Sequence, residues 1–478
     1  MLHPRRRPKA FLAAAVAAFL LLAGAAVAAY VVVLKRPGDI NNPDVPFLAP
    51  AATPPPTKAA KKPQPASFRW PRYGYTKDHR RVFDPPEPLR GPWRMKWKHR
   101  TPALTEFPPV IAKGRIYQLA DNATLVAREI GSGRRVWKRQ LGALSASSPA
   151  LEDGRIYVTI LETSKGASTG RIVCLRVAGG RILWSKKLPS RTESSPLLDG
   201  GRVYFGSEDG TLYALDARTG REQWTYQAAG AIKGSPTLSD GLLYFGDYGG
   251  HVHAVRARDG RRIWASAAAS RFLRGGRFYA TAAVAFGRVY IGATDGRAYS
   301  LSAKDGRVAW AHQTGRYVYS SAAVEDVPGA GPTVFFGSYD GTFYALDARS
   351  GKVRWKYRSG GKISGGATIL GDTVYFADLG RKITIGLDTR SGDVRFRWDL
   401  GAYDPVVSDG THIFITGNRS LSALEPKRAL KQRRAKKRAR KARARALLAP
   451  AWPERCQQLA PCGPLVAVRD RRIRARGS

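Results

Sequence analysis

The sequence repeats one pattern at intervals of about forty residues, and this repeat limits the folds that the chain can adopt. The pattern is clearest in DGTLYALDARTGREQW, residues 209–224. Side chains from Leu212 to Asp216 alternate between two sides, which is the period of a β-strand. A turn follows, because Asp216 can bind its own backbone and Gly220 tolerates a positive φ. Each repeat therefore predicts a β-hairpin whose second strand carries a tryptophan, here Trp224.

Aligning the chain on this tryptophan gives seven copies of the hairpin. Their last aromatic residues are Trp137, Trp184, Trp224, Trp264, Trp310, Trp355 and Phe396. A second hairpin precedes each one, as in residues 235–250, so that one period holds four short strands. Four strands at this period are typical of one blade of a β-propeller.

The two ends of the repeat region complete the count of blades. The last repeat, residues 406–426, has three strands and no tryptophan strand of its own. The missing strand fits WRMKWKH, residues 93–99, because Trp97 precedes Trp137 by 40 residues. The sequence therefore predicts an all-β, eight-bladed propeller of four-stranded blades over residues 92–426, closed by the N-terminal strand. Closure removes the exposed strand edges of an open array.

The motif A-x-D-x-x-T-G-x-x-x-W, found as ALDARTGREQW and ALDARSGKVRW, resembles the PQQ-type propeller repeat of quinoprotein dehydrogenases and BamB-type outer-membrane assembly proteins. WD40 propellers have a similar period, but their Gly-His and Trp-Asp signatures are absent here. The fold implies little about activity, since propellers include enzymes, scaffolds and binding modules. The residues assigned to the structural repeat are Asp216, Gly220, Trp224, Asp347, Gly351 and Trp355.

The N-terminus has the pattern of a membrane anchor. Residues 1–10 are basic, and residues 11–34 form a run of 24 residues without a charge. As a helix this run is about 36 Å long, against a hydrocarbon core of about 30 Å. The basic residues before it favour a cytoplasmic N-terminus, which would place the propeller outside the cytoplasm. A cleaved signal peptide is the alternative, because residues 26–28 offer a small-x-small site.

Residues 35–91 are rich in proline and poor in periodic apolar residues. This composition predicts a semi-extended linker that separates the propeller from the bilayer. Part of the aromatic stretch at residues 68–83 is expected to dock on the side of the propeller.

A candidate ligand site lies in the loops from the outermost strand of one blade to the innermost strand of the next. In propellers of this class these loops lie beside the central channel, on one face. Basic and tyrosyl groups gathered there would suit an anionic or peptide ligand, and a solvated rim is the alternative. The loop residues are Glu106, Arg191, Glu193, Lys233, Arg274, Arg277, Tyr279, Tyr317, Tyr319, Lys362, Tyr403 and Asp404.

The pattern of cysteines and acids favours no cofactor. Quinoprotein alcohol dehydrogenases place the quinone on a disulfide between adjacent cysteines, near a bound calcium ion. The three cysteines here are Cys174, Cys456 and Cys462, and no carboxylates have the spacing of calcium ligands. Neither PQQ nor Ca²⁺ is therefore favoured, and no catalytic residue is predicted.

Two further residue types have structural interpretations. His251 and His253 share one face of a strand and invite a metal hypothesis. However, His253 takes the slot of a repeat tyrosine, so we expect it to pack between blades and predict no metal site. Cys174 takes the slot of Ala214 and is expected to be a small buried filler.

The C-terminal residues 427–478 differ in kind from the repeats. They contain 18 basic and 2 acidic residues, and 12 of the 19 residues from Lys427 to Arg445 are Lys or Arg. Such a segment is expected to be disordered by itself and to bind polyanions. Cys456 and Cys462 could close a small disulfide loop in an oxidising compartment, or remain free thiols.

The interpretation favoured by these features is a single-pass, membrane-anchored propeller outside the cytoplasm, acting as a non-catalytic binding or scaffold module of a bacterial cell envelope. Its expected partners are the membrane at the anchor, envelope proteins or peptides at the rim, and anionic lipid or wall polymer at the tail. Nucleic acid is disfavoured by the anchor. The alternative is an extracytoplasmic PQQ-dependent dehydrogenase.

Overall fold

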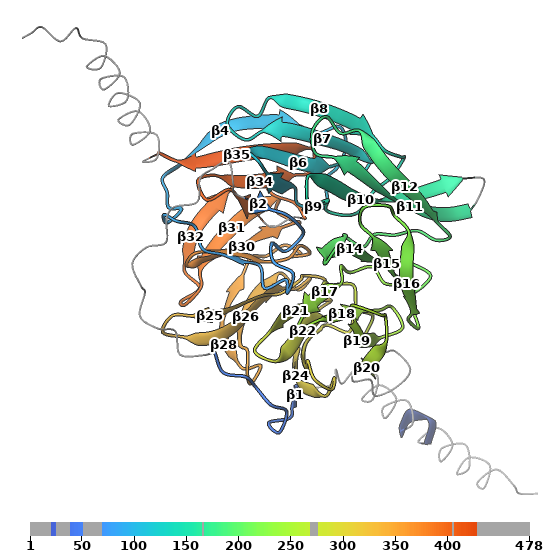
Figure 1. Ribbon diagram of the computed structural model, residues 1–478. Coiled ribbons are helices and arrows are strands. Elements are labelled where there is room, and N and C mark those ends of the chain that lie inside the picture. Colours follow the sequence, from blue (N-terminus) through green and yellow to red (C-terminus); the bar gives the residue numbers. More distant parts are fainter. Residues whose placement is uncertain are drawn as a thin grey trace, which may run out of the picture. The chain divides into compact units, whose positions relative to one another are not determined.

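Eight antiparallel sheets are arranged as blades around a common centre in the computed structural model of the chain (Figure 1). The structure describes residues 21–24, 39–50, 69–164, 167–267, 276–403 and 406–427. Each blade has four strands that follow one another in the sheet, and the innermost strands of several neighbouring blades contact each other. The predicted eight-bladed propeller is therefore confirmed.

The strands can be grouped by their position in the blade. The innermost are β5 (Val110–Ala112), β9 (Ala150–Glu152), β13 (Leu197–Asp199), β17 (Thr237–Ser239), β21 (Ala283–Ala285), β25 (Ala323–Val327), β29 (Thr368–Leu370) and β33 (Val407–Ser408). The second are β6 (Arg115–Leu119), β10 (Arg155–Ser164), β14 (Arg202–Gly206), β18 (Leu242–Gly246), β22 (Arg288–Gly292), β26 (Gly331–Gly337), β30 (Thr373–Asp378) and β34 (Ile413–Gly417). The third are β7 (Thr124–Glu129), β11 (Ala167–Arg176), β15 (Thr211–Asp216), β19 (His251–Arg256), β23 (Arg297–Ser302), β27 (Thr342–Asp347), β31 (Ile383–Asp388) and β35 (Ser420–Pro426). The outermost are β8 (Arg135–Gln140), β12 (Ile182–Leu188), β16 (Glu222–Gln227), β20 (Arg262–Ala267), β24 (Val308–Gln313), β28 (Val353–Arg358), β32 (Val394–Trp398) and β4 (Trp93–Arg100).

The ring closes through β4, which comes from the N-terminal side and forms the outermost strand of the last blade. It pairs with β35 in antiparallel register, and Trp97 lies opposite Ala423. This is the register of the repeat, in which Trp224 lies opposite Ala214. The predicted closure is therefore confirmed.

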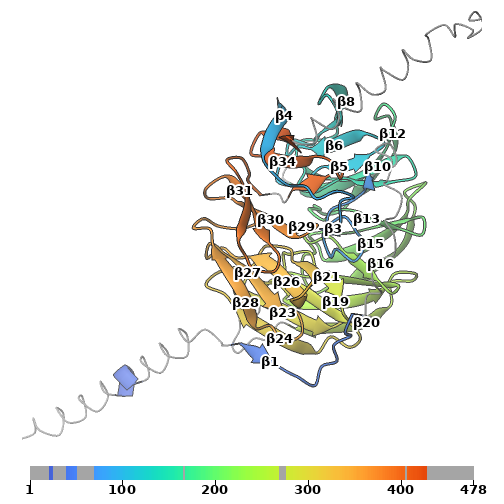
Figure 2. The same cartoon turned by 90° about the vertical axis from the view of Figure 1, so that its left-hand side faces the viewer.

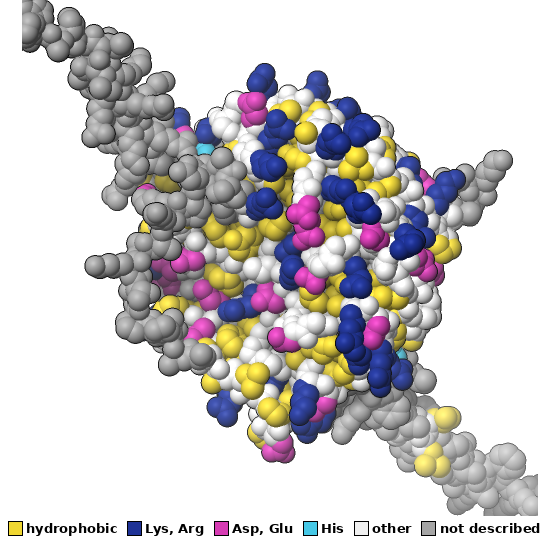
Figure 3. Space-filling view, in the orientation of Figure 1, with side chains coloured by type: hydrophobic (Ala, Val, Ile, Leu, Met, Phe, Trp, Pro, Cys, Tyr) yellow, Lys and Arg dark blue, Asp and Glu magenta, His cyan; other side chains and the backbone are white. Residues whose placement is uncertain are grey.

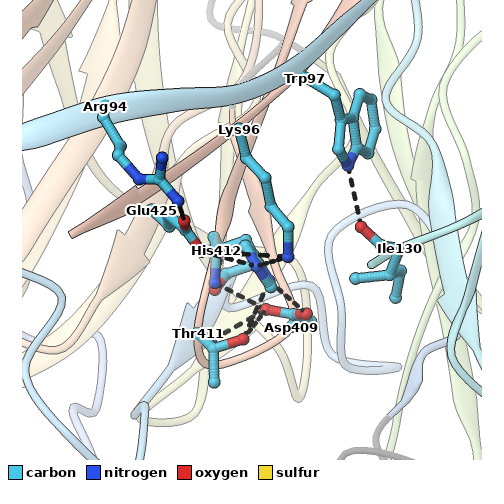
Figure 4. A network of polar contacts seen from close by, with 9 residues as sticks. Arg94, Lys96, Trp97, Ile130, Asp409, Thr411, His412 and Glu425 are labelled. Atoms are coloured by element: carbon cyan, nitrogen blue, oxygen red, sulfur yellow. Dashed lines mark hydrogen bonds and ion pairs between the residues drawn. The ribbon is translucent and has the colours of Figure 1, made fainter. Parts of the chain in front are cut away.

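A polar network fixes the closing strand to the last blade (Figure 4). Glu425 is almost fully buried and accepts a hydrogen bond from Arg94, while Lys96 Nζ lies 2.9 Å from His412 Nε2. Burial by itself would raise the pKa of Glu425, but Arg94, Lys96 and His412 together lower it. The carboxylate is therefore held in its charged form where the two ends of the propeller meet.

The repeat tryptophans connect each blade to the next. Their indole N–H groups donate to backbone carbonyls of the following blade at 2.9–3.1 Å. The pairs are Trp97 with Ile130, Trp137 with Val177, Trp184 with Ala217, Trp224 with Ala257, Trp264 with Ala303, Trp310 with Ala348, and Trp355 with Thr389. Phe396 has no donor at this position, and its ring instead packs edge-on against Trp93 of the closing strand at 5.4 Å.

The turn of the repeat explains why its Asp and Gly recur. Asp216 Oδ1 accepts hydrogen bonds from the backbone N–H of Arg218 and from both the N–H and the hydroxyl of Thr219. Gly220 has a φ of 76°, and a Cβ there would lie 2.7 Å from the ring of Trp184 in the preceding blade. The same two requirements act on Asp347 and Gly351 in a later blade. The turn therefore forms the surface on which the neighbouring tryptophan packs.

Part of the chain before the propeller pairs with its blades. Strand β1 (Ile40–Asn41) lies beside β24 and pairs with it (Figure 2). Strand β2 (Arg69–Trp70) pairs with the innermost strand β5, and β3 (Val82–Phe83) runs parallel to the innermost strand β29. Between β2 and β3, backbone carbonyls accept hydrogen bonds from innermost strands of four further blades. Residues 69–83, here called the plug segment, thus cross the centre of the ring rather than its side. Residues 39–50 and 69–91 belong to the folded unit, and this part of the linker prediction was wrong.

The predicted anchor and tail are not tested by the structure. Residues 21–24 are helical, and the rest of the expected anchor at 11–34 lies outside the described residues. Within the part of the chain that is described, no helix is long and apolar enough to cross a membrane. Residues 428–478 also lie outside the described residues.

We expect Trp97→Ala to destabilise the whole propeller by about 3–5 kcal/mol, because it removes a buried indole and its hydrogen bond at the point of closure. Thermal unfolding of the full-length chain measures this as a lower midpoint. Met95→Ala on the same strand is the matched control, since Met95 is exposed and should change stability little. Equal midpoints for the two variants would contradict the role assigned to the closing strand.

Candidate functional site

One face of the ring carries a central cavity, formed where two sets of loops meet. The strands of a blade alternate in direction, so the loops between blades and the loops between second and third strands lie on the same face. Six residues predicted from the sequence line this cavity together, namely Glu106, Glu193, Lys233, Tyr279, Tyr319 and Tyr403.

The other predicted residues lie around the cavity or outside the described residues. Tyr317 is half exposed, and its ring lies 5.6 Å from that of Tyr319. The guanidinium of Arg277 lies over the ring of Tyr248, and Lys362 Nζ lies over the ring of Tyr339, each at 5.7 Å. The remaining residues are Arg191, which does not line the cavity, and Arg274 and Asp404, which the structure does not describe.

Lys233 is paired with acids rather than free for an anionic ligand. Its Nζ donates to Glu193 at 2.8 Å and to Glu208 at 3.0 Å, and all three side chains are mostly buried. Burial would lower the pKa of Lys233, but the two carboxylates outweigh it and raise the pKa. This lysine, which lines the cavity, is therefore held charged by residues of its own chain.

Tyrosines form a continuous aromatic group around the cavity. The ring of Tyr319 lies 5.3 Å from Tyr279 and 4.9 Å from Tyr339, and Tyr279 lies 6.3 Å from Tyr248. Sequence reasoning missed Tyr248 and Tyr339, because it considered only the loops between blades. Both lie in the turns GDYGG and GSYDG between second and third strands, and equivalent positions in the repeat could have shown this.

The plug segment forms part of the cavity wall. Tyr73 lines the cavity, and its hydroxyl lies 3.3 Å from Ser321 Oγ on the facing loop. The enclosed volume is about 70 Å³. Pockets that bury small-molecule cofactors typically have roughly 300–1,000 Å³. The cavity is therefore a shallow depression with room for the end of one side chain.

Two neighbouring carboxyl groups have raised pKa values, namely Glu106, which lines the cavity, and Asp121, which accepts a hydrogen bond from its backbone N–H. Burial raises the pKa of Glu106 to about 7, with further contributions from the charges of Asp121 and Glu193. Burial also raises the pKa of Asp121 to about 6, against a hydrogen bond from the backbone N–H of Glu106. The Glu106 side chain has no hydrogen-bond or ion-pair partner among the described residues. The cavity thus contains an acidic group that lacks a positive counterpart.

The resemblance to quinoprotein dehydrogenases suggests a quinone cofactor and a calcium ion, but the described residues of the cavity do not fit either group. The described residues contain no group of three His, Cys, Asp or Glu side chains arranged to hold a metal ion. Among the residues that the structure describes, no tryptophan and no cysteine line the cavity, and its volume is small. We therefore derive no redox step for this site.

The remaining predictions for single residues are consistent with structural roles. His253 is buried, and its ring nitrogens lie 3.0 Å from the hydroxyl of Tyr226 in the preceding blade and 3.1 Å from Asp247 Oδ2. Cys174 is fully buried opposite Trp184, in the position that Ala214 has in its own blade. Both residues pack as expected.

Comparison with known proteins gives the same fold. A family model described as outer membrane protein assembly factor BamB matches residues 90–167, 160–275, 234–358, 295–402 and 340–471. The crystal structure of BamB from Moraxella catarrhalis is 15% identical, with a TM-score of 0.56, and the match covers 70% of this chain and 98% of that one. A europium-containing methanol dehydrogenase is 13% identical, with a TM-score of 0.63, covering 76% and 98%. Quinohemoprotein alcohol dehydrogenase from Comamonas testosteroni is 13% identical, with a TM-score of 0.61, covering 77% and 81%. No curated protein matches the sequence.

We expect Glu106→Gln to flatten the dependence of stability on pH. Folded Glu106 keeps its proton up to about pH 7, whereas the unfolded chain loses it near pH 4.5, so the free energy of unfolding falls as pH rises through this window. Because the side chain is partly exposed, the variant should remove only about 1 kcal/mol of this fall between pH 4 and pH 8. Denaturant unfolding at the two pH values measures the difference. Glu222→Gln on β16 is the surface control, and an identical pH dependence for wild type and Glu106→Gln would contradict the assignment.

Proposed function

We propose, from the premise that this chain belongs to the family of the outer membrane protein assembly factor BamB, that it is a membrane-anchored propeller outside the cytoplasm. In this proposal it binds a segment of another envelope protein at the tyrosine-lined cavity and carries out no chemistry. The observation that carries the proposal is the aromatic group around a shallow cavity, formed by Tyr248, Tyr279, Tyr317, Tyr319, Tyr339 and Tyr403.

Tyrosines suit protein recognition because each buries a large flat surface and still offers a hydroxyl group. They are enriched at the centres of protein interfaces and among the residues that contribute most to binding. The cavity has room for the end of one side chain and is surrounded by such rings. It therefore favours a partner that binds as an extended segment and inserts one anchoring residue.

The charges at the cavity favour a basic anchoring residue. Lys233 is already neutralised by Glu193 and Glu208, whereas Glu106 has no partner in the described residues. A lysine or arginine side chain could pair with Glu106 and lie against the rings of Tyr279 and Tyr403, which combines an ion pair with cation–π contact. The proposed partner is therefore a segment that presents a lysine or arginine, rather than an anion.

The location rests on the sequence alone. The basic residues 1–10 and the uncharged residues 11–34 support a single-pass anchor with the propeller on the far side of the membrane. A dehydrogenase remains the second candidate because propellers of quinoprotein dehydrogenases share this fold. The small cavity and its residues favour the binding role.

Tyr319→Ser is expected to weaken partner binding at least tenfold, the factor that corresponds to about 1.4 kcal/mol, because it interrupts the aromatic group at its centre. A photo-crosslinking amino acid at Tyr317, used in intact cells, captures the partner, and mass spectrometry identifies the captured segment. The same group at Val353, exposed on β28, is the control.

The expected result is one segment with a lysine or arginine, captured from position 317 only and lost with Tyr319→Ser. Capture of an acidic segment would contradict the basic anchoring residue. Stoichiometric binding of PQQ and Ca²⁺ with dye-linked alcohol oxidation would contradict the binding role itself.

The basic tail is proposed as a second, electrostatic contact with anionic lipid or wall polymer. Residues from Lys427 to Arg445 carry the densest charge, and lysines and arginines are also numerous on the face of the propeller shown in Figure 3. Removing residues 428–478 should therefore weaken binding to anionic vesicles and remove most of its salt dependence. For single-stranded nucleic acid, the logarithm of the binding constant falls with the logarithm of the salt concentration, with a slope of about −0.7 per neutralised phosphate. A single strand therefore serves as the polymeric comparison. Equal, salt-insensitive binding by full and truncated chains would contradict a role for the tail.

A further inference from the structure

The plug segment brings three basic side chains into the centre of the ring. Arg72, His79 and Arg81 are 8%, 1% and 1% exposed. The segment is held there by its backbone, because the carbonyls of residues 71, 77, 78, 80 and 81 each accept a hydrogen bond from an innermost strand. Buried charges are rare in proteins unless they are paired, since burial removes their hydration.

Arg81 is the side chain whose charge has no acidic counterpart in the part of the chain that the structure describes, and only Tyr73 partly offsets the effect of burial on its pKa. No carboxylate forms an ion pair with it among the described residues, and its Nε and Nη2 have no hydrogen-bond partner. The ring of Tyr73 covers one face of the guanidinium at 4.1 Å. Such a contact stabilises the charge but leaves the N–H groups in the guanidinium plane unsatisfied.

The surroundings of Arg81 are closely packed. Its Nη1 lies against Gly366, where an added Cβ would be 3.2 Å away, and its Cζ would be 3.4 Å from a Cβ at Gly74. The free edge, made by Nε and Nη2, is the fork with which arginine binds anions through two parallel hydrogen bonds.

The neighbouring basic groups do not remove the need for a counter-ion. Arg72 lies near the acids Glu152 and Asp199. His79 Nδ1 is 2.9 Å from Thr237 Oγ1, and burial together with the charges of Arg81 and Arg72 holds its pKa well below the usual range. His79 is therefore neutral, and the uncompensated positive charge is that of Arg81.

We propose that a small inorganic anion of the class of chloride binds inside the ring at the Nε–Nη2 edge of Arg81. The anion accepts both free N–H groups and neutralises the buried charge. Because Arg81 is almost fully buried and closely packed, the proposed ligand is a small ion such as a halide. The bound anion fixes the plug segment, and through Tyr73 it supports the floor of the cavity on the other side. This inference does not depend on the proposed function.

Thermal unfolding of the full-length chain tests the site in solution. At constant ionic strength, replacing gluconate by chloride should raise the melting midpoint by roughly 2 °C for each tenfold increase in chloride above its dissociation constant. Arg81→Met should abolish this dependence. Arg69→Met removes the same charge from an exposed position on β2 and should retain it. An unchanged chloride dependence in Arg81→Met would overturn the proposal.

Crystals of the wild-type chain grown with bromide give a second test that does not need a folded variant. The expected result is an anomalous peak at hydrogen-bonding distance from Arg81 Nε and Nη2. The proposal would be overturned if water rather than bromide occupied the Nε–Nη2 edge of Arg81 and the melting midpoint did not depend on the anion.

Discussion

The contact on which the rest of the structure depends is the packing of each repeat tryptophan on the turn of the following blade. The indole needs a flat surface and an acceptor, and the turn supplies both, a glycine without a side chain and the carbonyl of a nearby residue. Because blades touch only their neighbours, this contact must also be made across the ends of the chain. Trp97 makes it there, and the buried Glu425 with Arg94 holds the closing strand in register. Closure thus gives every blade a neighbour on both sides.

A ring of innermost strands leaves a central opening, and here the chain fills it from one side with its own N-terminal segment. This changes what the other side can do. The opening becomes a small cavity with Tyr73 in its lining. The plug segment also brings two arginines, Arg72 and Arg81, into the centre. The interior of the ring therefore contains buried positive charge that the repeats themselves do not introduce.

The cavity is acidic, whereas the chain as a whole is strongly basic. The chain has a formal net charge of +44, yet Lys233 at the cavity is paired with two acids, Glu193 and Glu208, and Glu106 lines the same cavity without a positive partner among the described residues. In the proposed function, the acidic, aromatic depression selects a basic side chain at short range, and the basic surface and tail attract polyanions at longer range. These two electrostatic properties act at different distances and need not serve the same partner.

The sequence determined the blades, their number and their closure, because these follow from a local period and from turn and tryptophan positions that recur in every copy. It also placed six of the residues that line the cavity, since the position of a loop in the repeat fixes the face on which it lies. Only the tertiary structure decided which of these side chains meet. Lys233 pairs with Glu208 as well as Glu193, and Glu208 belongs to a loop between second and third strands. Tyr248 and Tyr339 come from loops of this same kind and pack against Tyr279 and Tyr319, which line the cavity. The path of residues 69–83 through the ring was likewise decided by tertiary contacts, because a single segment that pairs with innermost strands of several blades has no period that sequence reasoning could detect.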